Sequence, residues 1–233
     1  EKNFKIFKSQ KYWIHQTSVG LLAYNRPIFN PEEYVKENYE IFFEYYLPKT
    51  NDVVIELGSG VGNETIYISS LIGKQGKVIA VEPFKEIFDL LRKTIEINNV
   101  KNVLMVNKAI YKSNTEIGFL SDKYNWLGGK IDKNSKEKMP TITLNNLVIE
   151  NKLSKIDFCK INIEGAEKYI LESSDLFLKI CNNFAIECHD FLDDEKNKTH
   201  LKVKNFLREN NFKIKLSKRN KYPWDKYYVF AYK

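Results

Sequence analysis

The stretch that decides the fold reads Asn51-Asp-Val-Val-Ile-Glu-Leu-Gly-Ser-Gly-Val-Gly-Asn-Glu64. Residues 53–57 form a short, mostly β-branched run without clean alternation, which is typical of a parallel strand covered on both faces. Glycine follows at every second position, at Gly58, Gly60 and Gly62, and an apolar helix begins directly afterwards. A strand, a glycine turn and a helix N-terminus together form a cradle for a nucleotide-like ligand.

The spacing of the glycines favours one kind of ligand. A dinucleotide fingerprint requires glycine at the first, third and sixth positions of its turn, and the sixth position here is Asn63. The acid Glu56 lies inside the strand instead, and the whole pattern resembles motif I of Rossmann-like methyltransferases that use S-adenosylmethionine. The alternative is an ordinary tight turn between a strand and a helix. The candidate cofactor-binding residues of this stretch are Glu56, Gly58, Ser59, Gly60, Gly62 and Asn63.

Predicted strands and helices alternate along most of the chain. Strands are expected at 77–82, 102–107, 155–163 and 183–189, and helices at 63–72, 84–98, 143–149, 165–177 and 195–210. Two strands at 212–216 and 227–232 follow with no helix between them, which predicts one antiparallel strand. The fold class is therefore α/β, with a Rossmann-like, seven-stranded, mostly parallel and doubly wound sheet.

Two parts of the chain flank or interrupt this pattern. Residues 1–48 are predicted to be an N-terminal extension, with short aromatic strands up to residue 30 near the pocket mouth. A helix is expected from Asn30-Pro31 to about Tyr46, because a capping residue, proline and acids open it. Residues 49–233 form the cofactor-binding domain, and 108–142 are expected to be an insertion or hairpin with a mobile loop.

The composition argues against a membrane-spanning protein but does not identify a binding partner. The net charge is +7, which permits nucleic acid or anionic ligands, but the lysines are spread along the whole chain. No apolar run approaches the roughly 18 residues that span a membrane, and the first residues have no apolar signal region. Three cysteines without metal-type spacing predict reduced thiols in a cytoplasmic protein. The oligomeric state is left open.

The carboxyl ends of the second and third strands carry further cofactor candidates, because ligands of such sheets lie at these ends. Glu82 ends the second strand before Pro83, and its carboxylate is expected to accept hydrogen bonds from both ribose hydroxyls of an adenosine. Asn107 follows the third strand and is expected at the adenine edge, with Ala109 or Ile110 on the face of the ring. A surface acid and a loop asparagine are the alternatives.

The fourth and fifth strands carry the catalytic candidates. Lys160, Asn162 and Glu164 share one face, and Glu187 and His189 share a face of the next strand. Polar groups there are costly to bury unpaired, so either a pocket or ion pairs of Lys160 with Glu164 or Glu187 must explain them. His189 is the general-base candidate, oriented by Glu187 or Glu164, with Lys160 stabilising a developing alkoxide. No metal site is predicted, although a site at Glu187 and His189 is left open.

The order of the motifs resembles the FkbM family of S-adenosylmethionine-dependent methyltransferases over roughly residues 50–190. The matching segments are Ile55-Glu-Leu-Gly-Ser-Gly-Val-Gly62, Ala80-Val-Glu-Pro83, Thr143-Leu144, Lys160-Ile-Asn-Ile-Glu-Gly-Ala-Glu167 and Ile186-Glu-Cys-His189. The resemblance implies O-methylation of a hydroxyl, often on a sugar, a glycan or a polyketide-like metabolite. Two positions depart from it, since Asn162 and Asn145 stand where the family usually has aspartate. An amide cannot act as a base, but it can still bind the cofactor through hydrogen bonds.

Two other functions fit the same sequence. A methyltransferase acting on the ribose of RNA would use the basic charge, whereas base N-methylation is disfavoured because Asn162-Ile-Glu-Gly replaces the usual Asn/Asp-Pro-Pro-aromatic motif. A protein that binds S-adenosylmethionine without catalysis would fit Asn162. A small-molecule or glycan acceptor is favoured over nucleic acid, and Tyr124 and Trp126 are candidates for stacking on a sugar ring.

Overall fold

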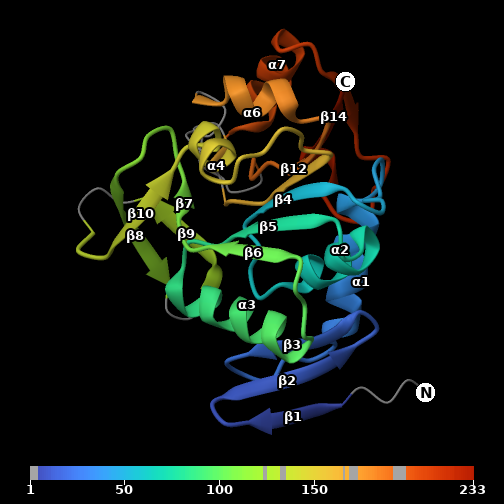
Figure 1. Cartoon of the computed structure of the whole chain (residues 1–233), viewed down its shortest axis with the longest axis vertical. Helices are drawn as coiled ribbons and strands as arrows, with labels where there is room; N and C mark the ends of the chain where they lie inside the picture. Colours follow the sequence, from blue (N-terminus) through green and yellow to red (C-terminus); the bar gives the residue numbers. More distant parts are fainter. Residues whose placement is uncertain (1–4, 123–124, 132–134, 165, 168–172, 191–197) are drawn as a thin grey trace.

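The computed structural model describes residues 5–122, 125–131, 135–164, 166–167, 173–190 and 198–233. Its centre is a seven-stranded sheet in the order β13-β14-β12-β11-β4-β5-β6 (Figure 1). Only β14 runs antiparallel to its neighbours in this sheet, which confirms the predicted α/β class and the single reversed strand. The strands are β4 (Val53–Leu57), β5 (Lys77–Val81), β6 (Val103–Val106), β11 (Phe158–Ile161), β12 (Asn183–Glu187), β13 (Lys213–Leu216) and β14 (Tyr228–Tyr232).

Helices cover both faces of this sheet. Alternate residues of β4 enter opposite cores: Val54 packs with the α1, α2 and α3 side, and Ile55 and Leu57 pack with the α4, α6 and α7 side. This explains the absence of polar alternation in the central strands. The helices are α1 (Pro31–Phe42), α2 (Asn63–Ile72), α3 (Lys85–Ile97), α4 (Leu144–Glu150), α6 (Asp175–Ile180) and α7 (His200–Glu209).

Several predicted boundaries differ from the observed ones. The strand expected at 155–163 is confined to β11, and α1 ends at Phe42 rather than near Tyr46. The Asn30 side chain makes no capping bond to the backbone, and its amide bonds to the Glu33 carboxylate instead. The helix expected at 165–177 falls partly outside the described residues, and α6 continues to Ile180.

The N-terminal extension contains the predicted short strands in a three-stranded antiparallel sheet, formed by β1 (Ile6–Ser9), β2 (Tyr12–Thr17) and β3 (Gly20–Tyr24). This sheet lies against α3 at the lower end of the view (Figure 1). The Asn98 side chain joins them, because its Oδ1 accepts from Leu21 N at 2.9 Å and its Nδ2 donates to Leu21 O at 2.7 Å. Helix α1, rather than these strands, contributes side chains to the ligand cavity.

Residues 108–142 contain the predicted hairpin within a second small sheet, in the order β7-β10-β8-β9. Its strands are β7 (Ala109–Ile110), β8 (Glu116–Asp122), β9 (Asn125–Ile131) and β10 (Lys138–Ile142). Tyr124 and the side chain of Trp126, the two candidates for sugar stacking, lie outside the described residues. The hairpin begins beside the carboxyl end of β6, so its first residues are placed near the cofactor candidates.

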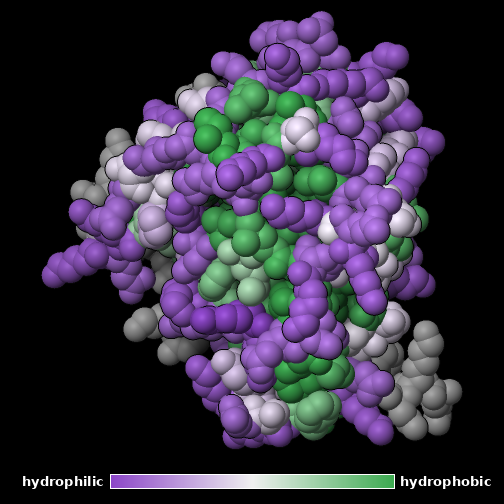
Figure 2. All heavy atoms as spheres, in the orientation of Figure 1, coloured by the Kyte–Doolittle hydropathy of each residue, from purple (hydrophilic) through white to green (hydrophobic). Residues whose placement is uncertain are grey.

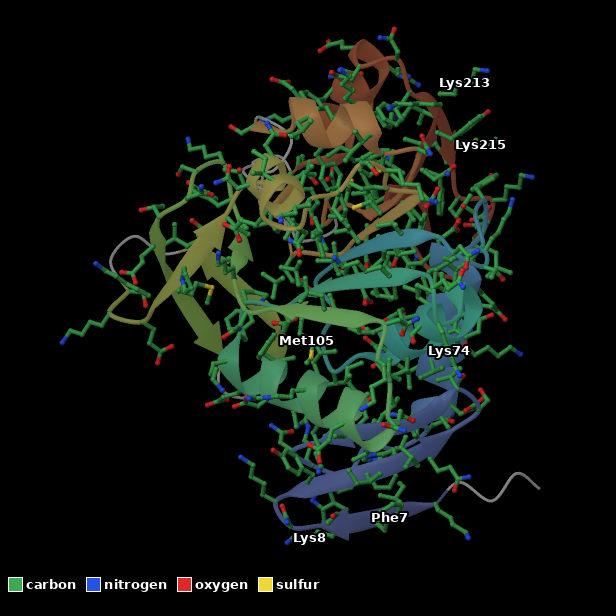
Figure 3. All side chains as sticks on the ribbon, viewed as in Figure 1. Phe7, Lys8, Lys74, Met105, Lys213 and Lys215 are labelled. Atoms are coloured by element: carbon green, nitrogen blue, oxygen red, sulfur yellow. The ribbon has the colours of Figure 1, made fainter. Side chains whose placement is uncertain are left out.

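The charged surface is dispersed, as the spacing of the lysines predicts. Figure 2 shows hydrophilic side chains spread over the viewed face, with several hydrophobic areas between them. The labelled lysines of Figure 3 lie on separate elements: Lys8 on β1, Lys74 after α2, and Lys213 and Lys215 on the edge strand β13. No helix among the described residues has the length and apolar content required to cross a membrane.

Candidate functional site

The glycine turn between β4 and α2 lies close to the backbone of two neighbouring segments, at Asn162 and at Val81. Gly58 has φ of +77°, and a side chain there would place Cβ 1.8 Å from the backbone oxygen of Asn162. The amides of Gly58 and Ser59 both donate to Val81 O, at 3.0 and 3.1 Å, which ties the turn to β5. Gly60 has φ of +54°, and no atom lies within 4 Å of the position of its Cβ. Gly58 is therefore required for packing, whereas Gly60 leaves space for a ligand.

Glu82 lies beside this turn at the end of β5, as predicted. Its Oε2 accepts from Gly60 N and its Oε1 accepts from Phe84 N, both at 3.0 Å. Burial raises the pKa of this carboxyl group to about 7, although the two backbone bonds favour the charged form. The carboxylate is held at the base of the turn, where its remaining lone pairs can accept hydrogen bonds from a ligand.

Glu56 and Lys160 form a buried ion pair under the turn. The two residues are neighbours in the register of β4 and β11, and Lys160 Nζ lies 3.7 Å from Glu56 Oε1. Lys160 Nζ also donates to Gly58 O at 2.9 Å, and Thr65 Oγ1 donates to Glu56 Oε2 at 2.5 Å. Burial raises the pKa of Glu56 to about 7, against the effect of Lys160. The ion-pair alternative for Lys160 thus involves Glu56 rather than Glu164 or Glu187.

Helix α1 is pressed against the same turn by aromatic side chains. The Phe42 ring lies 4.9 Å from Lys160 Nζ, and the Tyr39 hydroxyl donates to Asn63 O at 2.9 Å. As a result, Tyr34 and Asn38, which lie nearer the N-terminus of α1, line the ligand cavity. The sequence offered no signal for them, because their neighbours in the fold lie far along the chain.

One cavity joins these groups at the carboxyl ends of the strands. It brings together eleven of the predicted site residues, from the turn, the end of β5, the segment that begins the hairpin region and the end of β11. Sequence reasoning missed Tyr34, Asn38, Glu64 and Lys108. The lining residues are Tyr34, Asn38, Gly58, Ser59, Gly60, Val61, Asn63, Glu64, Val81, Glu82, Pro83, Phe84, Ile87, Lys108, Ala109, Ile110, Ile117, Lys160, Asn162, Ile163, Glu164 and Ala166.

Two oxygen atoms of this lining suit a polar ligand that carries hydrogen-bond donors. Asn63 Oδ1 and Asn162 Oδ1 are buried and have no hydrogen-bond partner among the described residues. Buried polar atoms are normally paired, so a ligand with donors at these positions would satisfy them. Together with the open space at Gly60 and the carboxylate of Glu82, these atoms fit an adenosine-containing cofactor with an amino-acid tail.

Some predicted residues lie outside the described lining of the cavity. Asn107 Nδ2 donates to the carbonyl oxygens of Glu82 and Pro83, at 2.9 Å each, so its amide supports the loop after β5. Gly62 packs against Leu91 and Thr94 of α3, and Glu56 lies beneath the turn. Glu187 ends β12 and is hydrogen-bonded with the Tyr228 hydroxyl.

His189 also lies outside this lining, between two carboxylates. Its Nδ1 is 2.8 Å from Glu167 Oε1, and its Nε2 is 3.4 Å from Glu164 Oε2. Burial lowers the pKa of this imidazole, but the hydrogen bonds to Glu164 and Glu167 outweigh burial and raise it to about 10. Thr199 Oγ1, just before α7, donates to the second oxygen of Glu167 at 3.2 Å. Glu167 was missed because it lies six residues beyond the end of β11, outside the alternating pattern of the strand.

A comparison with protein families identifies the domain. The model of the methyltransferase FkbM domain matches residues 55–214, which is more than half of the chain. The chain belongs to the FkbM methyltransferase family. Membership confirms the resemblance derived from the motifs and extends the matched region beyond β12, to β13. It also confirms S-adenosylmethionine as the cofactor of this FkbM domain.

Curated relatives match only short segments of the FkbM domain. A tRNA (cytosine(72)-C(5))-methyltransferase of Pyrococcus horikoshii is 30% identical over 76 residues, which are 33% of this chain and 19% of that protein. A probable cobalt-precorrin-6B C(15)-methyltransferase (decarboxylating) of Sulfurisphaera tokodaii is 35% identical over 52 residues, 22% of this chain and 27% of that protein. The matches thus span well under half of either relative.

Solved structures share the fold over most of the chain. The precorrin-6y C5,15-methyltransferase of Geobacter metallireducens has a TM-score of 0.51 at 13% identity, covering 91% of this chain and 95% of that one. M. jannaschii TYW2 in complex with AdoMet also gives 0.51, at 14% identity, covering 97% and 86%. At such identities the likeness shows the fold alone, which confirms the class predicted from the alternating strands and helices.

The part of the FkbM domain that the structure describes holds no group of three or more histidine, cysteine or acidic side chains suited to a metal ion. The three cysteines are buried and unpaired.

Proposed function

We propose that this protein transfers the methyl group of S-adenosylmethionine to a hydroxyl oxygen of a sugar, a glycan or a related metabolite. One observation carries the proposal: a single cavity joins the glycine turn and Glu82 to the polar groups Asn162 and Glu164 at the end of β11. When bound, the cofactor supplies an electrophilic methyl group, so that the oxygen–carbon bond forms as the carbon–sulfur bond breaks and leaves its electron pair on sulfur. The free buried thiols favour a reducing compartment, and we propose the cytoplasm.

The cofactor half of the cavity contains residues suited to the ribose, the adenine and the amino-acid tail of S-adenosylmethionine. Glu82 would accept hydrogen bonds from the ribose hydroxyls, and Ala109 and Ile110 would contact the apolar face of the adenine. The unpartnered oxygens of Asn63 and Asn162 would accept from the polar tail. Such preorganised contacts hold the reacting atoms in line, and positioning of this kind can supply up to roughly 7–11 kcal/mol of the barrier reduction.

The other half of the cavity suits an uncharged acceptor with many hydroxyls. Tyr34, Asn38, Glu64 and Glu164 offer hydrogen-bond donors and acceptors from three separate elements. Carboxylates at Glu64 and Glu164 would repel the phosphates of a nucleic acid near the reacting oxygen. The exposed lysines of β13 are far along the sheet from this opening, five strands from β5. These features favour a sugar-like acceptor over RNA.

The first experiment is calorimetric titration of the purified protein with S-adenosylhomocysteine, beside Glu82→Ala. Binding in the micromolar range by the wild type, weakened about tenfold or more in the variant, is expected because charged hydrogen bonds contribute ~1.5–3 kcal/mol. Glu209→Ala, on the exposed end of α7, serves as the control. No binding by the folded wild type would contradict the proposed function.

The second experiment identifies the acceptor class. Transfer of a radiolabelled methyl group is measured with methyl glycosides, nucleoside diphosphate sugars and short RNA oligonucleotides. Methylation of a sugar hydroxyl supports the proposal. Methylation of RNA, with an affinity that falls steeply with salt, would favour the ribose methyltransferase. Cofactor binding with no transfer to any member of the panel would favour a protein without catalytic activity.

A further inference from the structure

Glu164 is the carboxylate that the end of β11 presents to the acceptor half of the cavity. It lines the cavity, and its side chain keeps 27% of its surface exposed. Its backbone has φ of +55°, an uncommon conformation for a residue other than glycine. Outliers of this kind gather at functional sites when the surrounding structure holds them in place.

The groups behind Glu164 hold it in this position. His189 Nε2 lies 3.4 Å from Glu164 Oε2, and the opposite ring nitrogen is engaged by Glu167 at 2.8 Å. The Thr199 hydroxyl in turn donates a hydrogen bond to Glu167 Oε2 at 3.2 Å. The line Glu164–His189–Glu167–Thr199 thus runs from the cavity wall to the start of α7, and His189 itself is only 2% exposed.

An imidazole enclosed in this way cannot serve as the base. Both of its nitrogens face carboxylate oxygens, which only accept hydrogen bonds when ionised, so these contacts favour a proton on each nitrogen. Glu187 on β12 is a further charged neighbour, and it also favours the charged ring. An imidazolium has no free nitrogen lone pair with which to accept a proton.

We propose that Glu164 accepts the proton of the acceptor hydroxyl, and that His189 is a positioning residue that acts through Glu164. This inference rests on the proposed function and reverses the roles expected from the sequence. As the acceptor oxygen bonds to the methyl carbon, its hydroxyl proton moves to a carboxylate oxygen of Glu164, and the O–H electron pair stays on the acceptor oxygen. His189 keeps its own protons throughout and holds Glu164 toward the cavity.

The charge state of His189 tests the inference without any acceptor. In protein labelled with ¹⁵N-histidine, the two ring nitrogens of His189 are followed by NMR from pH 6 to 9, with and without S-adenosylhomocysteine. Assignment uses the loss of signal in His189→Gln. The shifts of an imidazolium at every pH up to 8.5 are expected. Titration to a neutral ring near pH 6.5 would overturn the inference, whether or not the proposed function holds.

Steady-state kinetics test the proton transfer itself, with the compound of the acceptor panel that the wild type methylates as substrate. Glu164→Gln is expected to lower kcat by about 10²–10⁴-fold, with the affinity for S-adenosylhomocysteine changed less than about threefold. His189→Gln should lower kcat less and move the acidic limb of the kcat profile to higher pH, because Glu164 loses its neighbouring cation. His200→Gln, a histidine of α7 away from Glu164, is the matched control.

Two kinetic outcomes would overturn the inference. One is full turnover by Glu164→Gln, and the other is a larger loss of kcat in His189→Gln than in Glu164→Gln with an unchanged pH profile. Circular dichroism and thermal denaturation establish that each variant is folded. If the wild type fails to bind S-adenosylhomocysteine, the proposed function fails, while the NMR result still decides the state of His189.

Discussion

At the scale of single residues, two glycines of one turn are predicted to respond differently to alanine. Gly58→Ala should lower the free energy of unfolding by about 3 kcal/mol or more, because its Cβ would meet the backbone oxygen of Asn162 at 1.8 Å. Gly60→Ala has open space and should cost only about 1–2 kcal/mol for its positive φ. Its methyl group would enter the cavity, however, and weaken binding of S-adenosylhomocysteine.

Urea denaturation and calorimetric titration of both variants measure the two effects. The expected loss of affinity in Gly60→Ala is about tenfold, which corresponds to ~1.4 kcal/mol. Equal destabilisation by the two substitutions, or unchanged binding by folded Gly60→Ala, would contradict the division between a packing glycine and a ligand-facing glycine.

At the scale of elements, the N-terminal sheet is predicted to stabilise the domain without taking part in the site. Asn98→Ala removes both hydrogen bonds of the Asn98 side chain to Leu21. The backbone N–H and carbonyl of Leu21 then lose this partner. The free energy of unfolding should fall by about 1–3 kcal/mol. The affinity for S-adenosylhomocysteine should not change, because no described residue of β1, β2 or β3 lines the cavity.

Chemical denaturation and calorimetry check this prediction, with Glu96→Ala as the control on the same helix. The Glu96 side chain is 66% exposed, so its removal should change stability by less than about 0.5 kcal/mol. A marked loss of cofactor affinity in Asn98→Ala would show that the N-terminal sheet also shapes the cavity.

At the scale of the whole molecule, stability should depend on pH through the buried His189. Its pKa is raised to about 10, so the folded state holds the proton more tightly than the unfolded chain. The resulting stabilisation is complete below the ordinary histidine pKa of about 6.5 and is lost as the pH rises through 10. The difference in unfolding free energy between wild type and His189→Gln should therefore shrink from pH 6.5 to pH 9.5.

Urea unfolding at both pH values measures this difference. Glu56 and Glu82, whose pKa values are raised to about 7, lower stability as the pH rises toward 7. They are present in both proteins, so their effect cancels in the comparison. A difference that stays constant with pH would contradict the paired, protonated state of His189.

The sequence by itself determined the sheet and the position of the glycine turn and Glu82 at its edge. Buried strands have continuous apolar runs, the glycine turn has its own spacing, and Glu82 directly ends a strand. All of these are local patterns of a few residues, and parallel strands of a doubly wound sheet bring their carboxyl ends to one edge. Gly58, Gly60 and Glu82 line the cavity, and their contacts with the cofactor stay a prediction.

Only the tertiary structure decided the partners within the site. Lys160 pairs with Glu56 because β11 lies beside β4 with these residues in register. Tyr34 reaches the cavity because aromatic packing presses α1 onto the turn. His189 is enclosed because the chain after β11 returns Glu164 and Glu167 to the end of β12. Each contact joins residues distant in sequence, and strand order and loop conformation bring them together, which no local periodicity encodes.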